Sequence, residues 1–347
     1  MNVLYIKRDK PSDSLVKTIY HHIQDHLYFH DQDGFFESAL HSMVNITEVS
    51  LKDVLKYKPS VNYDWVLINW KQSSYTTDND RGQAILRALV NYPISRKAIF
   101  IGAAQAEYLP PVEVLDAMTL IFKREPFRNR DLYNLTETNR IKIVPTMISC
   151  PFVHSPGENI LARIYSYLHP TVSICHINET CFEVGFSGAD AAGHTIRQDV
   201  WARVKAEGFS TVGGLQPNPY TKAPIPSELA APRFKVKDYR DSLCQAKINL
   251  ALDGIGQYTF RHQELLYLGA FMMSGPSIRD LDLIIPLEEN VHYVAFNDLD
   301  DMVEKIRYYL AHKDERQKIA LAGKKLFDEY YNPKLHGQTL LARLNKL

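Results

Sequence analysis

Short apolar runs alternate with longer amphipathic segments throughout the first 150 residues of this 347-residue chain. Such alternation is typical of parallel β-strands buried between layers of helices. The clearest predicted helix, 81–91, places Ile85, Leu86 and Leu89 on one face. We therefore expect residues 1–150 to form a doubly wound, Rossmann-like α/β domain. Six apolar runs bounded by polar or turn residues are its predicted strands: 2–6, 46–49, 65–70, 97–102, 120–123 and 141–144.

The same alternation returns after a proline-rich segment, 145–170, which we interpret as the connection between two domains. Asp298 is expected to cap one of the later helices, and 213–232 is interpreted as a long surface loop. Residues 151–331 are expected to form a second α/β domain, and 332–347 a C-terminal helix that packs back on the first domain. The predicted strands are 181–186, 247–252, 271–274 and 292–296, and the predicted helices are 196–207, one from 259, 299–310 and 335–344.

The composition indicates a fully folded protein without a broad charged surface. The chain is 45% hydrophobic and 23% charged, which is typical of globular proteins and excludes extended disorder. The 40 basic and 40 acidic residues cancel, and no cluster of lysines and arginines suggests general nucleic-acid binding. The four cysteines show neither CxxC pairs nor zinc-ligand spacing, so we expect buried thiols.

No targeting or membrane-spanning segment is evident in the sequence. The first residues lead directly into a strand pattern, without the apolar core of a signal peptide. No apolar run approaches the roughly 20 residues that span a bilayer. We expect a cytoplasmic protein, with peripheral association at a membrane left open.

The segment 247–276 carries the strongest candidate for chemistry, because it places charged residues at the start of a helix that follows a glycine loop. Thr259 is expected to cap this helix, and Arg261, His262 and Glu264 occupy its first turns. A helix N-terminus with an arginine in the same turn suits a diphosphate, and Glu264 is placed to bind ribose hydroxyls. The alternative is that Arg261 and Glu264 form an ordinary surface ion pair.

A second candidate phosphate loop lies in 182–201, between another strand and helix. Gly188 and Gly193 permit close backbone approach, and Arg197 lies in the first turn of the helix. The alternative is a plain turn with a solvated arginine. Two such turns in one domain favour a shared anion site.

The C-terminal half resembles the donor domain of GT-B glycosyltransferases, in particular the glycosyl transferases group 1 and exostosin-like branches. The resemblance is carried by the strand 247–252, by Arg261-x-x-Glu264, by Gly269, and by the tail 291–327 with its strand, helix, Asp-Glu-Arg turn and second helix. It implies two Rossmann-like domains that face each other across a cleft.

The resemblance also implies an activity and roles for individual residues. The activity is transfer of a sugar from a nucleotide-diphosphate donor, such as a UDP- or GDP-sugar, to a hydroxyl of a glycan or glycolipid-linked acceptor, as in polysaccharide biosynthesis. Arg197 and Arg261 resemble the arginines that hold the donor diphosphate, and Glu264 resembles the acid that binds the donor ribose. The predicted donor site comprises Gly188, Arg197, Thr259, Arg261, His262 and Glu264.

One departure from the family leaves the stereochemistry open. Retaining members carry Glu-x7-Glu, whereas Gly256 stands eight positions before Glu264. An inverting mechanism needs a base that takes the acceptor proton. We predict Glu107 for this role, because it follows the fourth strand and carboxyl-end loops line the crevice of doubly wound sheets. His30 and Asp33 are predicted to bind the acceptor, with catalysis as the alternative.

Asp280-Leu281-Asp282 matches the DxD metal motif of the other main glycosyltransferase fold. Its position after a strand and a turn argues against a metal site. We expect no metal and no cofactor, because arginines and helix N-termini can neutralise the diphosphate instead.

Two other functions remain open at this point. Some phage glucosyltransferases that act on a modified DNA base share this architecture, but the neutral charge counts against DNA binding. A binding protein that holds a nucleotide sugar without turnover is the non-enzymatic alternative, since a fold does not fix a function.

Overall fold

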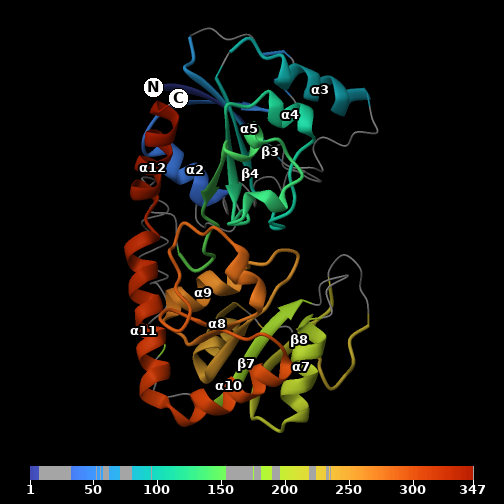
Figure 1. Ribbon diagram of the computed structural model, residues 1–347, viewed down its shortest axis with the longest axis vertical. Coiled ribbons are helices and arrows are strands. Elements are labelled where there is room, and N and C mark those ends of the chain that lie inside the picture. Colours follow the sequence, from blue (N-terminus) through green and yellow to red (C-terminus); the bar gives the residue numbers. More distant parts are fainter. Residues whose placement is uncertain are drawn as a thin grey trace.

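Two parallel β-sheets, each covered by helices, form the two halves of the computed structural model (Figure 1). The predicted site residue His30 and most of the predicted domain connection lie outside the residues that the structure describes. Those residues are 1–7, 33–51, 53–54, 56–57, 62–70, 80–94, 96–153, 175, 181–189, 196–218, 224–231, 234 and 236–346.

The N-terminal sheet has six parallel strands in the order β2-β1-β3-β4-β5-β6. The structure confirms all six predicted strands to within a few residues, and β3 is buried along its whole length. A strand covered by helices on both faces reads as a continuous apolar run, which explains this clear sequence signal. The strands are β1 (Asn2–Lys7), β2 (Asn45–Ser50), β3 (Trp65–Trp70), β4 (Lys97–Ile101), β5 (Leu120–Arg124) and β6 (Ile143–Thr146).

Helices cover both faces of this sheet. Helix α2 packs on one face, where Phe36 stacks on Phe100 of β4 with ring centroids 4.0 Å apart. Helices α3 and α4 cover the other face, where Leu89 and Leu115 join the core. The helical segments are α2 (Gly34–His41), α3 (Asp80–Val90), α4 (Val112–Asp116), the 3-10 turn η2 (Arg130–Leu132) and α5 (Glu137–Arg140).

The C-terminal sheet has five parallel strands in the order β11-β10-β9-β7-β8. Its predicted strands are confirmed, with β11 shorter than expected. The strands are β7 (Phe182–Ala189), β8 (Thr211–Gln216), β9 (Ala246–Ala251), β10 (Met272–Ser274) and β11 (Val294–Ala295). The helical segments are α7 (Ile196–Ala206), α8 (Val236–Gln245), α9 (Phe260–Leu268), η4 (Pro276–Asp280), α10 (Leu299–Ala311), α11 (Lys313–Tyr330) and α12 (Pro333–Asn345).

The prediction of a surface loop over 213–232 is wrong at its start, because Gly213 and Gly214 belong to the edge strand β8. Their φ angles are +91° and +146°, which side chains rarely adopt. A Cβ atom on Gly213 would lie 1.9 Å from the carbonyl oxygen of Phe186 on β7. Close pairing of β8 with β7 therefore requires glycine at a position that resembles a turn in the sequence.

Both sheets share one strand order, and this order fixes where a ligand fits. In each sheet the edge strand is the second strand of that sheet in chain order, and the first, third and later strands follow it across the sheet. The edge strand is β2 in the first sheet and β8 in the second. In such sheets the crevice opens at the carboxyl ends of the two strands between which the order reverses. These strands are β1 and β3 in the first sheet and β7 and β9 in the second.

Loops at the carboxyl ends of strands from both sheets meet at the contact between the domains. The amide of Arg128, after β5, donates to the carbonyl of Asp280, after β10, at 2.7 Å. Arg130 forms an ion pair with Asp282 at 2.6 Å. Both crevices therefore open toward this contact between the domains.

Helix α12 returns to the N-terminal domain after α11 has run along one side of the molecule (Figure 1). Leu340 and Leu344 are buried in the core that Phe36 of α2 also enters. A Cβ atom on Gly337 would lie 2.3 Å from the carbonyl oxygen of Ala39, so α12 approaches α2 closely. The C-terminal helix therefore forms a further connection between the two domains, in addition to the contact between their loops.

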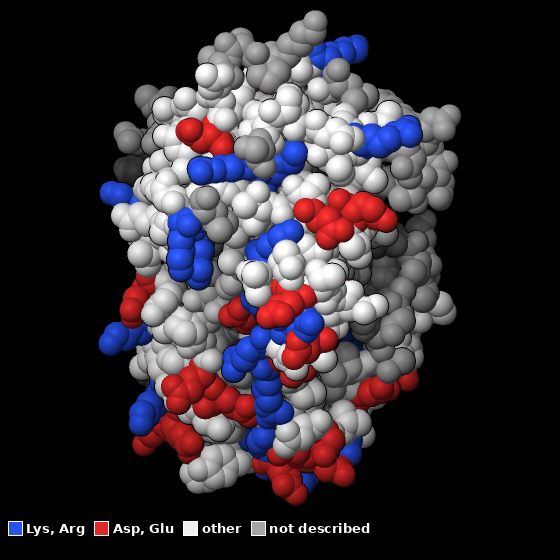
Figure 2. Space-filling model, turned by 45° about the horizontal axis from the view of Figure 1, so that its top comes forward, with Lys and Arg blue, Asp and Glu red and all other residues white. Residues whose placement is uncertain are grey.

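Charges of both signs are interspersed on the face shown in Figure 2. This pattern agrees with the net charge of zero. Within the described part of the chain, no helix combines the length and the apolar character needed to cross a membrane.

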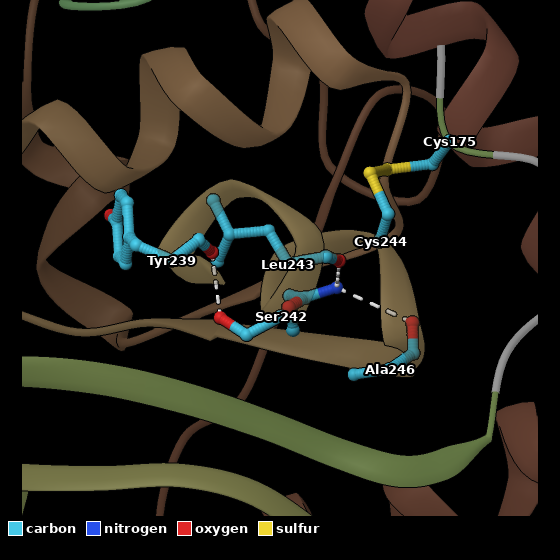
Figure 3. The surroundings of a disulfide bond; sticks show 7 residues. Cys175, Tyr239, Ser242, Leu243, Cys244 and Ala246 are labelled. Atoms are coloured by element: carbon cyan, nitrogen blue, oxygen red, sulfur yellow. Dashed lines mark hydrogen bonds between the residues drawn. A yellow bond between two sulfur atoms is a disulfide. The ribbon is translucent and has the colours of Figure 1, made fainter. Parts of the chain in front are cut away.

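The expectation of four buried thiols is wrong, because Cys175 and Cys244 form a disulfide (Figure 3). Cys244 lies in the last turn of α8, and the amide of Cys175 donates to the carbonyl of Leu268 at the end of α9. The two cysteines are 69 positions apart, so no local spacing could reveal the pair. The disulfide and this hydrogen bond hold Cys175 against the C-terminal ends of α8 and α9.

Candidate functional site

Helices α7 and α9 begin at the carboxyl ends of β7 and β9, the strands that flank the crevice of the second sheet. Arg197, in the first turn of α7, donates from Nε to the carbonyl of Asp253 at 2.6 Å and from Nη1 to that of Ala189 at 2.5 Å. Added Cβ atoms on Gly188 and Gly254 would lie 3.2 and 2.4 Å from its guanidinium. Arg197 is therefore a fixed cation among backbone groups, and the reading as a solvated arginine is wrong.

Arg261, in the first turn of α9, lies at the same crevice. Its Nη2 donates to the carbonyl of Ser187 at the end of β7, and its guanidinium lies over the ring of Tyr239, 4.8 Å from the centroid. The residue is 9% exposed, yet Nε and Nη1 have no hydrogen-bond partner among the described residues. A buried guanidinium normally satisfies its donors. Nε faces the carboxylate of Glu264 at 3.7 Å, which leaves Nη1 available to an anion.

Glu264 lies beside Arg261 but is not part of a surface pair. Its Oε2 atom is 3.7 Å from Nε of Arg261 and accepts a hydrogen bond from the hydroxyl of Tyr239 on α8. Only 5% of the residue is exposed. Burial raises the pKa of the Glu264 carboxyl, and Arg261 and Tyr239 act in the opposite direction. Arg261 and Tyr239 thus hold the Glu264 carboxylate in place, one turn after the start of α9.

His262 supports the start of α9 from inside the protein. It is fully buried, its Nδ1 accepts from the amide of Thr259 at 3.0 Å, and its Nε2 lies 3.0 Å from Oγ of Ser274. Thr259 is the N-cap, as predicted. Burial, together with the charges of Arg197 and Arg261, lowers the pKa of His262 to about 3. His262 is therefore a neutral support for the helix N-terminus rather than an exposed ligand.

Glu107 is exposed on the loop after β4, as predicted from its position. Its Oε2 accepts a hydrogen bond of 3.0 Å from Nε2 of Gln257, two residues before the N-cap of α9. Gln257 also accepts from the amide of Ala106 at 3.1 Å. The structure therefore brings the predicted base to the glycine loop of the predicted donor site.

Three consecutive charged residues are buried at the end of β5, next to this loop. Lys123 is fully buried and donates to the carbonyls of Ala103 and Gln105 at 3.0 and 2.9 Å. Burial lowers its pKa to about 7. Arg124 forms an ion pair with Glu125 and donates to the carbonyl of Tyr258 in the second domain at 3.0 Å.

Asp33 lies at the start of α2, near the crevice of the first sheet. It is 4% exposed, and its Oδ2 accepts from Nδ2 of Asn69 at 2.9 Å. Asn69 also donates to the hydroxyl of Tyr5 at 2.9 Å. An acceptor-binding role for Asp33 stays a prediction, and so does that of His30, which lies outside the described residues.

The residues of the DxD-like sequence serve the contact between the domains. Asp282 pairs with Arg130, and its amide donates to the carbonyl of Pro126 at 2.7 Å. Among the described residues no group of three or more histidines, cysteines or acidic residues could hold a metal ion.

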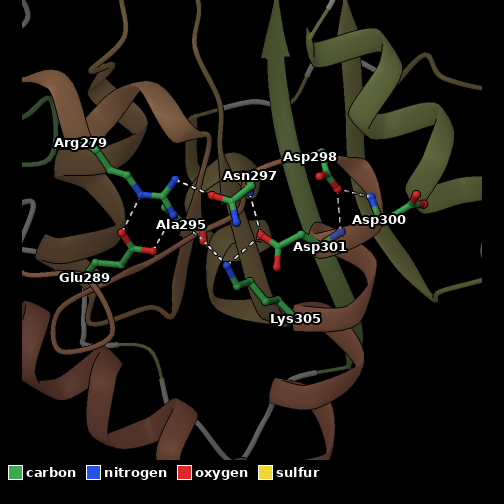
Figure 4. A network of polar contacts seen from close by, with 8 residues as sticks. All are labelled: Arg279, Glu289, Ala295, Asn297, Asp298, Asp300, Asp301 and Lys305. Carbon is green, nitrogen blue, oxygen red and sulfur yellow. Dashed lines mark hydrogen bonds and ion pairs between the residues drawn. The ribbon is translucent and has the colours of Figure 1, made fainter.

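A polar network at the carboxyl ends of β10 and β11 fixes the neighbouring segments (Figure 4). Arg279 on η4 binds Glu289 through two hydrogen bonds of 2.7 Å and Asn297 at 2.8 Å. Asp298 accepts from the amides of Asp300 and Asp301, which confirms it as the N-cap of α10. The polar groups of these residues are hydrogen-bonded to one another, so we interpret the network as one that stabilises the fold rather than as a binding site.

A pocket among the described residues lies elsewhere, beside the disulfide. Ala246, Lys247 and Phe271 line it, and they stand at or just before the amino ends of β9 and β10, opposite the crevice. Arg197, Arg261 and Glu264 are not among its lining residues. We therefore place the functional site at the carboxyl ends of β7 and β9.

Comparisons with known proteins agree with this architecture. Residues 199–342 match the family described as glycosyl transferase-like, while a comparison with curated protein sequences gave no match. The DNA modifying enzyme β-glucosyltransferase has a similar structure, with a TM-score of 0.54, 12% identity, and 99% of this chain and 100% of that chain covered. Anabaena HepE in complex with UDP-glucose gives a TM-score of 0.53 at 9% identity, with both chains fully covered. T4 phage BGT in complex with its UDP-glucose substrate gives 0.50 at 12% identity, also with both chains fully covered.

The chain therefore has the GT-B fold, with two Rossmann-like domains, as predicted. Its C-terminal domain carries the glycosyl transferase-like match, so the predicted resemblance to GT-B glycosyltransferases is confirmed. Both findings support the predicted enzyme class, a glycosyltransferase.

Sequence reasoning missed two residues of this site. Tyr239 comes from the preceding helix, 25 positions before Glu264. Nothing in the sequence around it distinguishes it from the other tyrosines. Gln257 contacts a loop 150 positions away in the other domain. The only local signal for Gln257 was its place between the glycine loop and the helix cap.

Proposed function

We propose that this protein transfers a sugar from a nucleoside-diphosphate sugar, with a UDP-sugar as the donor, to a hydroxyl group. The observation that carries the proposal is Arg261, whose nine-tenths-buried guanidinium keeps Nε and Nη1 without hydrogen-bond partners among the described residues. Arg197 adds a second cation at the same strand ends. The complexes of HepE and of T4 phage BGT with UDP-glucose support UDP as the nucleotide.

Each group then has a role in the reaction. The diphosphate lies at the N-termini of α7 and α9, between Arg197 and Arg261, and Glu264 accepts from the ribose hydroxyls. The acceptor oxygen forms a bond to the anomeric carbon while the bond from that carbon to the phosphate oxygen breaks. The electron pair stays on the diphosphate, where the two arginines stabilise the new charge. The acceptor proton passes to Glu107.

For the acceptor we propose a glycan or a glycolipid-linked sugar. Duplex DNA is normally bound through many Lys and Arg contacts to phosphates. This chain has equal numbers of basic and acidic residues, and both signs mix on the face shown in Figure 2. These charges favour a neutral sugar acceptor over a polyanion.

A modified DNA base is the second candidate acceptor, because the β-glucosyltransferase with a similar structure is a DNA modifying enzyme. The fold alone cannot choose between the two acceptors. The two proposals predict different effects of salt on acceptor affinity. Affinity for DNA falls steeply as the salt concentration rises.

The test begins with the donor and then turns to the acceptor. Thermal unfolding is measured with UDP, GDP, CDP and TDP and their sugars, since a ligand that binds only the folded state raises the melting temperature. We expect selective stabilisation by UDP. Release of UDP from UDP-glucose is then measured with oligosaccharides, glycolipids and DNA that carries a hydroxyl-bearing modified base as acceptors. Binding of UDP without transfer to any acceptor would favour a binding protein, and no stabilisation by any nucleotide would overturn the proposal.

We further propose that transfer needs no metal ion, because two arginines and two helix N-termini are available for the diphosphate. T4 phage BGT has been crystallised with UDP and Mn2+, so the question needs a direct test. Equal rates with EDTA and with Mn2+ support the proposal, and loss of activity in EDTA contradicts it.

A further inference from the structure

The loop that carries Glu107 is held from both domains. From the first domain, Nζ of Lys123 donates to the carbonyls of Ala103 and Gln105. From the second domain, Gln257 accepts from the amide of Ala106 and donates to the carboxylate of Glu107. An exposed side chain on a loop is ordinarily free to change its rotamer. Here a side chain of the opposite domain fixes it.

The backbone next to Gln257 is shaped for this loop. A Cβ atom on Gly256 would lie 2.0 Å from the carbonyl oxygen of Ala104, so only glycine allows the approach. Gln257 follows directly and lies two residues before Thr259, the N-cap of α9. The contact therefore connects the Glu107 loop to the start of the helix that carries Arg261.

We propose that Gln257 is a positioning residue for sugar transfer, which fixes the carboxylate of Glu107 relative to the first turn of α9. The inference rests on the proposed function, in which α9 holds the donor and Glu107 takes the acceptor proton. Gln257 forms no bond in the reaction and touches neither reacting atom. It acts through Glu107, so its loss lowers kcat and leaves donor affinity unchanged.

The kinetic test is a double-mutant cycle with Gln257→Met, which keeps the length of the side chain and removes both hydrogen bonds, and Glu107→Gln. We expect Gln257→Met to lower kcat by about 10- to 100-fold, the effect of losing a hydrogen bond to a charged group. The dissociation constant for UDP should stay within about twofold. Because Gln257 acts through Glu107, the double variant should be no slower than Glu107→Gln alone. Losses that multiply, or a weaker affinity for UDP in Gln257→Met, would overturn the positioning role.

A second measurement does not depend on activity. Hydrogen exchange of the Ala106 amide reports its bond to Gln257 directly, and we expect exchange at least about tenfold faster in Gln257→Met. Asp282→Asn is the matched control, because it weakens another contact between the domains and leaves Gln257 in place. Unchanged exchange in Gln257→Met, or equally fast exchange in Asp282→Asn, would overturn the specific contact. A wild-type protein with the protected amide but without turnover would show instead that the proposed function is wrong.

Discussion

The hydroxyl of Tyr239 donates a hydrogen bond to Oε2 of Glu264, and its ring lies against the guanidinium of Arg261. One side chain of α8 thus orients both charged residues that α9 presents to the crevice. The disulfide at Cys244 holds the other end of α8. The donor site therefore depends on α8, whose Arg240 also lowers the pKa of Glu264 through its charge.

Replacing Tyr239 with Phe should separate these two contacts. The ring remains under Arg261, but the carboxylate of Glu264 loses a buried hydrogen-bond donor, which costs about 1–3 kcal/mol. Because that bond lowers the pKa of Glu264, the pKa should rise further in the variant. We expect UDP to bind several-fold more weakly, as measured by calorimetry, with a larger loss at pH 5 than at pH 8. If Tyr239→Phe bound UDP as tightly as the wild type at both pH values, this hydrogen bond would have no role in donor binding.

Replacing Glu107 with Gln should suppress transfer and spare donor binding. The amide keeps the size of the side chain but cannot take the acceptor proton, and loss of a general base costs about 10²- to 10⁴-fold in rate. Steady-state rates and UDP affinities of the two proteins check this. Glu113→Gln, an acidic residue in the first turn of α4, is the control. A fully active Glu107→Gln enzyme would show that the base lies elsewhere.

The buried His262 should make the protein less stable in acid. Its pKa is about 3 in the folded protein, against about 6.5 for an unperturbed histidine. Between these values the unfolded chain binds a proton that the folded protein does not, so stability falls as the pH drops from 6.5 toward 3. Relative to His262→Gln, the wild type should lose on the order of 2 kcal/mol more between pH 6.5 and pH 5. Chemical denaturation at the two pH values measures the difference.

His336, whose pKa is lowered to about 4 by burial, is present in both proteins, so its contribution cancels in this comparison. Parallel pH profiles for wild type and His262→Gln would mean that His262 titrates normally.

Reduction of the Cys175–Cys244 disulfide should lower the stability of the second domain. Cross-links of this kind typically stabilise a protein by about 2–4 kcal/mol. We expect a reducing agent to lower the denaturation midpoint of the wild type and to leave that of Cys244→Ser unchanged. Cys150→Ser, which removes a buried free thiol, should keep the sensitivity to reduction. A wild type that is insensitive to reduction would contradict the presence of the bond in solution.

The sequence predicted every described strand except β8, the N-caps of α9 and α10, and the places of the two arginines, because each has a local cause. Apolar runs and N-cap residues act over a few positions, and Arg197 and Arg261 follow strand ends that the periodicity reveals. What it could not predict depends on chain segments that meet only after folding. The bond between Gln257 and Glu107 spans 150 positions. Gly213 was misread because a close strand pair and a turn both select glycine.

The most direct test of this account is the affinity for UDP of wild type and Arg261→Ala, measured by isothermal titration calorimetry. Arg307→Ala, which removes an exposed arginine of α10, serves as the control. We predict that UDP binds the wild type and the control equally. Arg261→Ala should bind about 10- to 100-fold more weakly, because a charge-assisted contact of roughly 1.5–3 kcal/mol is lost. Equal affinity of all three proteins for UDP would remove Arg261 from the donor site and contradict the account.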